Sequence, residues 1–171
     1  MLELIPIQTT FWKIATKLPG IFLRWHFSAE RLARLVYIDL QPRHEPAAVD
    51  LGQNPQFRLF LQVINLSPYS IKLDQANICF HFRGSDLKSF ILEKRTYAPG
   101  VIEVIFCQEN IDGTLAAGME NLAVNNGTWL SGNFEFTCKV RSFSKKLERL
   151  DGINPRVQGG RPMQIESPKN V

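Results

Sequence analysis

Apolar and polar residues alternate along much of the 171-residue chain after residue 34. Within 57–64 every second residue is apolar, which is the period of a strand with one buried face. The same period predicts further strands over 35–40, 71–83, 87–96, 101–107 and 128–141. Turn residues separate consecutive strands, so we expect antiparallel pairing, and single apolar faces predict two sheets packed together.

The alternation also assigns side chains to faces. In 71–83 we expect Ile78, Phe80 and Phe82 to point into the core, with Cys79 and His81 outward. In 101–107 we expect three inward residues, Ile102, Val104 and Phe106. In 128–141 the expected inward residues are Leu130, Phe134, Phe136, Cys138 and Val140.

Helical spacing is confined to short stretches. Thr9 and Thr10 precede an amphipathic pattern that runs to Leu18, where Pro19-Gly20 ends it. Ser28 is placed to cap a short helical turn through residue 34. Asp112 is a candidate cap for a helix that carries Leu115, Met119 and Leu122 on one side. Ser144–Leu150 is expected to form one or two further helical turns.

These patterns predict a mainly β chain of three parts. Residues 1–34 are an amphipathic extension, 35–152 form the β-sandwich, and 153–171, rich in Pro and Gly, are expected to be a flexible tail. The predicted fold class is an immunoglobulin-like antiparallel β-sandwich, with an N-terminal amphipathic helix and one short helix before the last strand.

The central region resembles the late embryogenesis abundant group 2 family, also called the water-stress and hypersensitive-response domain. The resemblance covers roughly residues 34–152. It rests on LVYIDLQP (35–42), FRLFLQVINLSPYSIKLDQANICFHFRG (57–84) and GTWLSGNFEFTCKV (127–140). It implies a seven-stranded sandwich with a helix near its C-terminal end, no agreed enzymatic activity, and protective or partner binding at membranes under stress.

Charge and cysteine content narrow the possible functions. A net charge of +4 does not indicate nucleic-acid binding, so we expect no nucleic-acid partner. The cysteines Cys79, Cys107 and Cys138 show no metal-binding spacing and suit a reducing compartment. Neither a signal peptide nor an apolar run long enough to span a bilayer is present. We therefore expect a cytoplasmic protein, either free or peripherally attached to a membrane.

The titratable residues form no recognisable catalytic site. His44 falls in a Pro-rich loop, and His26 lies near the N-terminal aromatic run. Cys79 and His81 share the outward face of one strand, but two ligands do not make a zinc site and no third Cys or His is close in sequence. We expect no enzymatic activity, no metal and no cofactor.

The N-terminal segment carries the strongest functional signal. Its aromatic and basic residues have the composition of an interfacial or partner-docking helix. The expected docking residues are Phe11, Trp12, Lys13, Lys17, Phe22, Arg24, Trp25 and Phe27. Three targets stay open: a membrane surface, a protein partner, or the chain's own sandwich.

A second basic group occurs late in the chain, in and after the last predicted strand. It comprises Lys139, Arg141, Lys145, Lys146 and Arg149. Such a patch could contact phosphate, acidic lipid or an acidic partner, although a solvated surface is the simpler interpretation.

The sequence thus predicts a non-catalytic interaction or scaffold module that docks through residues 1–34 to a protein partner or a membrane surface. The alternative is a lipid- or carbohydrate-binding sandwich that uses the loops at one end. Trp129 and Tyr97 are the aromatic candidates for that alternative.

Overall fold

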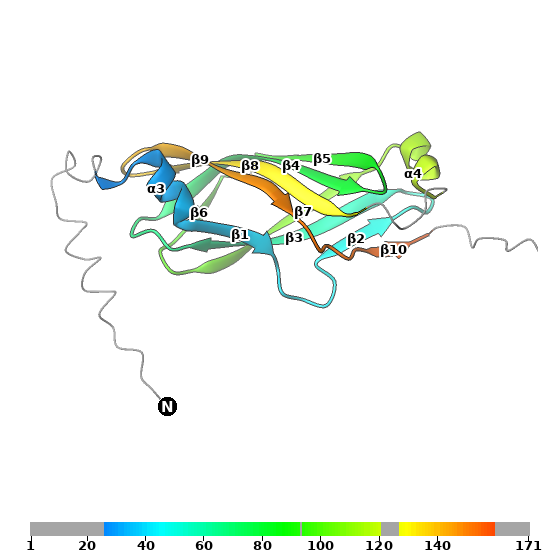
Figure 1. The fold of residues 1–171 in the computed structure, drawn as a ribbon, viewed down its shortest axis with the longest axis horizontal. Helices are drawn as coiled ribbons and strands as arrows, with labels where there is room; N and C mark the ends of the chain where they lie inside the picture. Colours follow the sequence, from blue (N-terminus) through cyan, green and yellow to red (C-terminus); the bar gives the residue numbers. More distant parts are fainter. Residues whose placement is uncertain (1–25, 93, 121–126, 160–171) are drawn as a thin grey trace, which may run out of the picture.

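The computed structural model describes residues 26–92, 94–120 and 127–159. Within these ranges, ten strands form two five-stranded sheets that pack face to face, with a short helix towards each end (Figure 1). The predicted mainly β, two-sheet sandwich is therefore confirmed. The helix predicted over Thr9–Leu18 lies outside the described residues.

Sheet A is organised around β3. This strand pairs antiparallel with β7 along one edge and with β1 and β2 along the other, while β10 adds to β2 in parallel. The strands are β1 (Val36–Leu40), β2 (Ala47–Asp50), β3 (Gln56–Asn65), β7 (Ile102–Asn110) and β10 (Arg156–Gln158).

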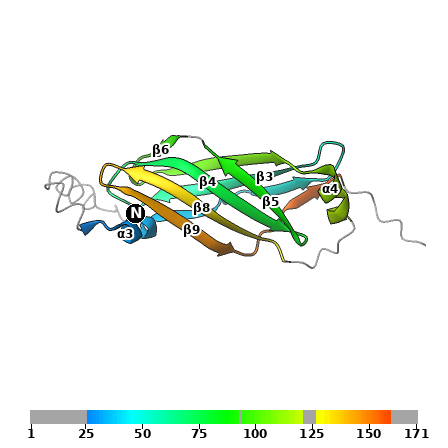
Figure 2. The same ribbon diagram turned by 90° about the horizontal axis from the view of Figure 1, so that it is seen from above.

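Sheet B is organised around β4 in the same way. β5 and β6 share one edge of β4, and β8 occupies the other edge with β9 beyond it; Figure 2 looks down on these strands. The strands are β4 (Ile71–Phe82), β5 (Ser85–Ile91), β6 (Arg95–Tyr97), β8 (Trp129–Cys138) and β9 (Ser142–Leu150).

The two described helices begin at the residues that the sequence indicated. α3 (Ala29–Arg34) is capped by Ser28, whose Oγ accepts the Arg31 amide at 3.2 Å. α4 (Gly113–Glu120) is capped by the carboxylate of Asp112, which accepts the amides of Thr114 and Leu115. The Thr114 side chain and then the two backbone N–H groups hydrogen-bond to this carboxylate and lower the pKa of Asp112, because they stabilise its ionised form.

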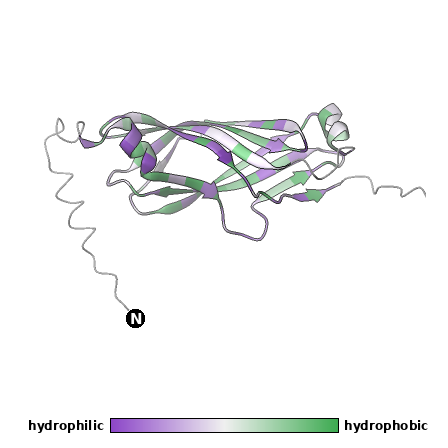
Figure 3. Cartoon of the chain, in the orientation of Figure 1, coloured by the Kyte–Doolittle hydropathy of each residue, from purple (hydrophilic) through white to green (hydrophobic). Residues whose placement is uncertain are grey.

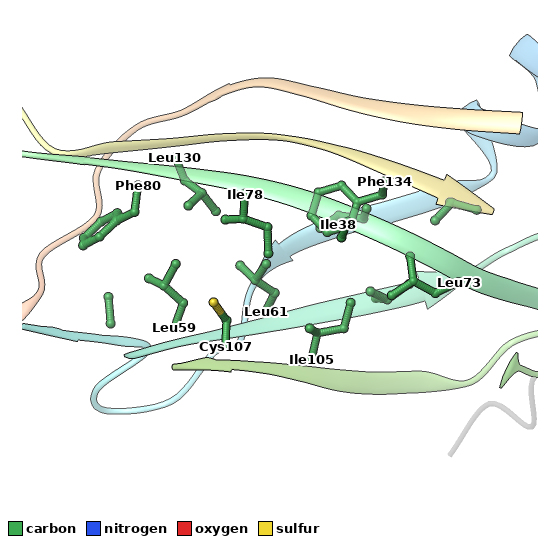
Figure 4. Close-up of a cluster of buried hydrophobic side chains, with 14 of the residues drawn as sticks. Ile38, Leu59, Leu61, Leu73, Ile78, Phe80, Ile105, Cys107, Leu130 and Phe134 are labelled. Atoms are coloured by element: carbon green, nitrogen blue, oxygen red, sulfur yellow. The ribbon is translucent and has the colours of Figure 1, made fainter. Parts of the chain in front are cut away.

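The core lies between the inner faces of β3 and β7 below and β4 and β8 above (Figure 4). Leu59, Leu61 and Ile105 meet Ile78 and Phe80 there, and all five are at most 3% exposed. Burying one such side chain contributes about 1.5–3 kcal/mol. The predicted inward faces of β3, β4 and β8 are confirmed.

The face predicted for 101–107 was wrong. Ile105 and Cys107 point inward, whereas Ile102 and Phe106 are 60% and 49% exposed. Both faces of this strand are apolar, so alternation alone could not choose between them. The pairing with β3 decides it, because Leu61 lies opposite Ile105 and the inward side of β3 is unambiguous.

Three element assignments also differ from the prediction. Ser144–Leu150 is not helical but belongs to β9, which pairs with β8. The predicted loop after residue 40 contains the short strand β2. The predicted strand 87–96 is divided into β5 and β6. The short helix α4 does precede β8, but β8 is followed by β9 and β10 and so is not the last strand.

The sandwich extends beyond both predicted boundaries. Phe27 and Leu32, assigned to the N-terminal extension, are 7% and 0% exposed within the core. Ile153 is buried too, and β10 pairs with β2, so 153–159 is not a flexible tail. The short β10 could not be recognised from its sequence because its three residues are mostly polar and it depends on β2 for pairing.

Asn65 closes one end of the sandwich through a buried network. Its side chain is fully buried, and Nδ2 donates to the carbonyl oxygens of Tyr69 and Tyr97 at 2.8 and 3.0 Å. Its Oδ1 accepts the amide and the hydroxyl of Ser67. The amide thereby joins the turn after β3 to β6 in the other sheet.

Replacing Asn65 with Ala leaves these buried carbonyl and N–H groups without partners. We expect Asn65→Ala to lower the free energy of unfolding by about 2–4 kcal/mol. The matched control is Asn77→Ala, an exposed amide on β4, with an expected change below about 0.5 kcal/mol. Urea denaturation followed by circular dichroism measures both, and equal effects would contradict the network's role.

Gly159 lets the end of β10 approach β2. An added Cβ would lie 2.4 Å from the Gly52 nitrogen, and the glycine φ is +77°. We expect Gly159→Ala to reduce hydrogen-exchange protection of the Leu51 amide, which donates to the Gln158 carbonyl, by about tenfold or more. Gly100→Ala is the control, since φ there is +73° but a Cβ meets nothing within 4 Å. Unchanged Leu51 protection in both variants would count against a tightly docked β10.

Candidate functional site

A compact group of reactive side chains lies on the outer face of sheet B. Cys79 and His81 project outward from β4, as the sequence predicted, and Asp86 projects from β5. The ladder places His81 directly opposite Asp86. We name these three residues the His81 cluster. Its ligand atoms, one from each side chain, all lie within 4.8 Å of one another.

The β4–β5 hairpin fixes this register. Its two turn residues, Arg83 and Gly84, both have positive φ values of 47° and 75°. Positive φ at both central positions is the geometry of a type I′ turn, which matches the twist of the flanking strands. Arg83 also donates to the Met119 carbonyl at 2.9 Å, which ties the hairpin to α4. The hairpin therefore holds His81 and Asp86 opposite each other.

The His81 imidazole is held on one face of its ring and at both nitrogens. Nδ1 forms an ion-pair contact with Asp86, and Nε2 lies 3.4 Å from the Ser131 Oγ. The ring stacks on Trp129 with centroids 3.3 Å apart and planes 15° from parallel. Arg149 in turn lies over the Trp129 ring, 5.2 Å from its centroid. The imidazole side chain is 18% exposed, so its orientation is set by neighbours rather than by solvent.

The thiol of the cluster is partly withdrawn from water. Burial raises the pKa of Cys79, and the charge of Asp86 raises it further, while Lys88 on β5 acts in the opposite sense. Cys79 is therefore held as a neutral thiol beside an imidazole and a carboxylate. A thiol in this state is a modest nucleophile, and a metal ion could displace its proton.

The arrangement offers two kinds of chemistry. One possibility is acyl transfer, in which a base held by a carboxylate activates a hydroxyl nucleophile. Ser131, His81 and Asp86 contact one another in that order, as hydroxyl, base and carboxylate. The thiol, imidazole and carboxylate together match the three ligand types that zinc takes from proteins. Metal binding uses all three members of the His81 cluster, whereas acyl transfer leaves Cys79 without a role.

Sequence reasoning placed Cys79 and His81 on one strand face but gave them no role, and it missed Asp86. The strands predicted over 71–83 and 87–96 left 84–86 between them as a turn, which placed Asp86 in a loop. The actual turn occupies Arg83 and Gly84, so Asp86 is a strand residue facing His81. Gly84 is a turn residue, but Arg-Gly is not among the pairs, such as Asn-Gly and Asp-Gly, that signal a two-residue hairpin, so the pairing of Asp86 with His81 had only a weak signal in the sequence.

The predicted N-terminal docking residues are tested only in part. Seven of them, 11–13, 17, 22 and 24–25, lie outside the described residues. Phe27 is described, and it packs edge-on against Tyr69 with ring centroids 5.3 Å apart. Phe27 is therefore a core residue of the sandwich and is not exposed for docking.

The predicted basic patch is divided between two faces. Lys145 pairs with the inward-facing Phe134, whereas Lys146 pairs with Asn133 on the outer face. This separation follows from the strand conformation of β9, because neighbouring strand residues point to opposite sides. Lys139 is exposed in the turn after β8 and Arg141 is half-buried. Arg149 is paired with Asp151 at 2.7 Å.

The aromatic residues proposed for an end-loop ligand site are also separated. Tyr97 is fully buried and packs against Phe136, so its predicted role as an exposed platform was wrong. Trp129 is half-buried on the outer face of sheet B, beside an open hollow of about 450 Å³ that includes Asn77 and Lys146. Its ring already contacts His81 and Arg149.

The outer face of sheet A carries a second distinctive surface. Six apolar side chains point outward from β1, β3 and β7, where the exposed face of an antiparallel sheet is ordinarily polar. We name this surface the sheet A face; it comprises Tyr37, Phe60, Ile64, Ile102, Val104 and Phe106. Figure 3 shows the hydrophobic segments along the strands of sheet A.

The described ranges, 26–92, 94–120 and 127–159, include no helix with the length and apolar character that a membrane span requires.

Alkylation should distinguish the three thiols. Cys79 is half-buried on the outer face, whereas Cys107 and Cys138 are in the core. We expect iodoacetamide to modify Cys79 first in the folded protein, and the rate to keep increasing as pH rises past the usual thiol pKa, because burial raises the pKa of Cys79. Peptide mass spectrometry over time measures this. Equal rates at all three thiols, or a fast phase that survives Cys79→Ser, would contradict the assignment.

No protein-family model and no curated protein matches this sequence. Two solved structures illustrate the similarity at the level of coordinates. A structural genomics target designated SoR45 aligns over 68% of this chain and 84% of its own, with 11% identity and a TM-score of 0.47. A putative ApaA protein from Bordetella pertussis aligns over 67% and 86%, with 10% identity and a TM-score of 0.42.

Proposed function

We propose that this chain is a non-catalytic interaction module that binds another protein through the sheet A face together with its aromatic and basic N-terminal segment. The observation that carries the proposal is the sheet A face itself, a group of apolar side chains on the outer side of sheet A. Isolated exposed apolar residues are common, but a contiguous group bordered by polar residues is typical of a binding surface.

The centre of this surface is aromatic. Phe60 and Phe106 lie opposite each other on paired strands, with ring centroids 4.8 Å apart. Arg43 covers Phe60, with its guanidinium carbon 3.9 Å from the ring centroid. Aromatic residues and Arg are the types that most often dominate binding energy at protein interfaces. The pair is therefore the expected centre of the contact.

One end of the sheet A face continues the aromatic centre with aliphatic residues. Ile64 and Ile102 are paired, and Tyr37 lies opposite Ile64 on β1. The Tyr37 hydroxyl donates to Asp39 at 2.8 Å, so its ring edge is held in place. The face therefore offers a rigid surface, whose backbone would not have to reorganise on binding.

The charges around the sheet A face favour a protein over a membrane. Arg43 and Arg58 lie at its border, and Asp39 and Asp50 balance them on the same outer side. A surface that binds anionic lipid would be predominantly basic. An apolar centre with a border of mixed charge instead fits an amphipathic surface of another protein.

The N-terminal segment lies close to this surface in the sequence. Residue 26 precedes α3, and α3 leads directly into β1, which contributes Tyr37. The N-terminal segment is therefore joined to the sheet A face through one short helix. We also propose that the module is of the late embryogenesis abundant group 2 type; the sandwich with α4 ahead of β8 agrees with that resemblance.

Photo-cross-linking in cells tests the proposal. A photoreactive phenylalanine analogue at position 106 of the full chain should give adducts with a distinct protein, whereas the same analogue at Ser144, exposed on sheet B, should not. The protein identified in the adduct should then bind the purified chain. Ile102→Asp/Phe106→Asp should weaken that affinity about tenfold or more, and the charge-matched Ser142→Asp/Ser144→Asp should change it less than about twofold.

Several outcomes would overturn the proposal. Adducts at 144 as abundant as at 106 would remove the sheet A face as the site. Adducts only with a second copy, or only with residues 1–25 of the same chain, would identify this protein itself as the occupant. Flotation with phosphatidylserine vesicles that the Ile102→Asp/Phe106→Asp variant abolishes would show a lipid surface instead. All variants are at exposed positions, and their melting temperatures confirm folding.

A further inference from the structure

We propose that the His81 cluster is a binding site for a divalent transition-metal ion, with zinc as the best-matched ion. Cys79, His81 and Asp86 would be the protein ligands, and the fourth position would be left to water or to a group from another molecule. This inference is independent of the sheet A face, which lies on the opposite side of the sandwich.

The ligand chemistry supports this assignment. Zinc in proteins is bound by thiolate, imidazole and carboxylate groups, and sites with three protein ligands keep one open position. Magnesium and calcium prefer oxygen ligands alone, so the thiol and the imidazole select against them. Among the described residues, this is the one group of Cys, His and acidic side chains that meets the spacing of a metal site.

The distances are compatible with a metal ion without backbone movement. Zinc bonds of about 2.0–2.3 Å place tetrahedral ligand atoms roughly 3.3–3.7 Å apart. The ligand atoms of the cluster lie within 4.8 Å of one another, and His81 and Asp86 are already in contact. Side-chain rotations of Cys79 and Asp86 that move their ligand atoms by about an ångström therefore suffice to reach the spacing of a tetrahedral zinc site. Asp86 is half-exposed, so this rotation meets little resistance.

The hairpin supplies the rigidity that a metal site needs. Cys79 and His81 are two residues apart on β4, which is paired on both edges, and their side chains share one face. Asp86 is fixed opposite His81 by the two-residue turn. Ligands on paired strands lose little conformational freedom on binding, which favours affinity.

The neighbours of His81 are placed to orient its imidazole without binding the metal themselves. With a metal at Nδ1, the proton must reside on Nε2, and the Ser131 hydroxyl lies 3.4 Å from that atom, where it can accept it. Stacking on Trp129 keeps the ring pointing towards Cys79 and Asp86. Outer partners of this kind orient the metal-binding imidazole in known zinc sites.

The electrostatics predict that metal binding releases protons. Burial raises the pKa of Cys79, so the thiol is protonated before the metal arrives. The ionisable groups that face it are Asp86 and Lys88 on β5 and His81 on β4. Acidification should weaken binding because protons compete for the thiolate and the imidazole.

Cobalt substitution provides the direct test. The full chain, freed of metal with a chelator, is titrated with Co²⁺, whose bond to a thiolate gives an intense near-ultraviolet charge-transfer band. We expect one equivalent of Co²⁺ to produce this band. Added Zn²⁺ should displace the bound Co²⁺, and the band should then disappear. Isothermal titration with Zn²⁺ should show the same stoichiometry. In a separate thermal unfolding scan, bound Zn²⁺ should raise the melting temperature.

Matched variants decide between the ligands and their neighbours. Cys79→Ala should abolish the band, whereas Cys138→Ala, which removes a buried thiol elsewhere, should retain it. Asp86→Asn should weaken Zn²⁺ binding about tenfold or more, whereas Glu148→Gln, an exposed carboxylate on the same sheet, should leave it unchanged. Asp86 and Glu148 are both exposed, so these two variants are expected to stay folded.

Three results would overturn the site. The absence of a charge-transfer band in the wild-type chain would exclude a thiolate-bound metal. A band that survives Cys79→Ala would place the metal on another thiol. Zn²⁺ affinity that is equal in Asp86→Asn and the wild type would show that Asp86 remains only the ion-pair partner of His81.

Discussion

A single irregularity in β4 determines which side chains reach the outer face of sheet B. The pairing of β4 with β8 shifts by one residue between Leu73 and Gln75, so the strand contains a β-bulge. Before the bulge the odd-numbered positions Ile71 and Leu73 are buried, and after it the even-numbered positions are buried. Without the shift, Cys79 and His81 would point into the core. The bulge switches the inward-facing positions of β4 from odd to even numbers, and both the His81 cluster and the apolar interior of sheet B depend on that switch.

The sequence predicts the fold well wherever only one face of a strand is apolar. The alternation in β3 and in the second half of β4 leaves one choice of inward face, and both were predicted correctly. β7 carries apolar residues on both faces, so its orientation depends on pairing with β3, which single-strand alternation does not contain. Tertiary pairing likewise decides β9, for which the sequence predicted helical turns over Ser144–Leu150, and β10, which has no apolar pattern.

In the candidate site, too, part of the arrangement follows from one strand alone and part depends on pairing between strands. Cys79 and His81 share a strand face, and this follows from their spacing alone. Asp86 joins them only through the register of the β4–β5 hairpin, which depends on two residues with positive φ, one of them the non-glycine Arg83. A left-handed Arg is uncommon, and the surrounding structure must compensate for it. Its hydrogen bond to the Met119 carbonyl, 36 residues away in the sequence, is one of the described contacts that hold it.

The two surfaces that carry the functional proposals are physically separate. The sheet A face and the His81 cluster lie on the outer sides of two sheets, with the close-packed core between them. Face-to-face sheets lie about 10 Å apart, so a substitution on one outer face reaches the other only through buried side chains. Sites separated in this way usually show additive effects. A change in partner binding caused by substitutions at the His81 cluster would therefore indicate coupling through the core, or through α4, which Arg83 contacts and which follows β7 of sheet A in the chain.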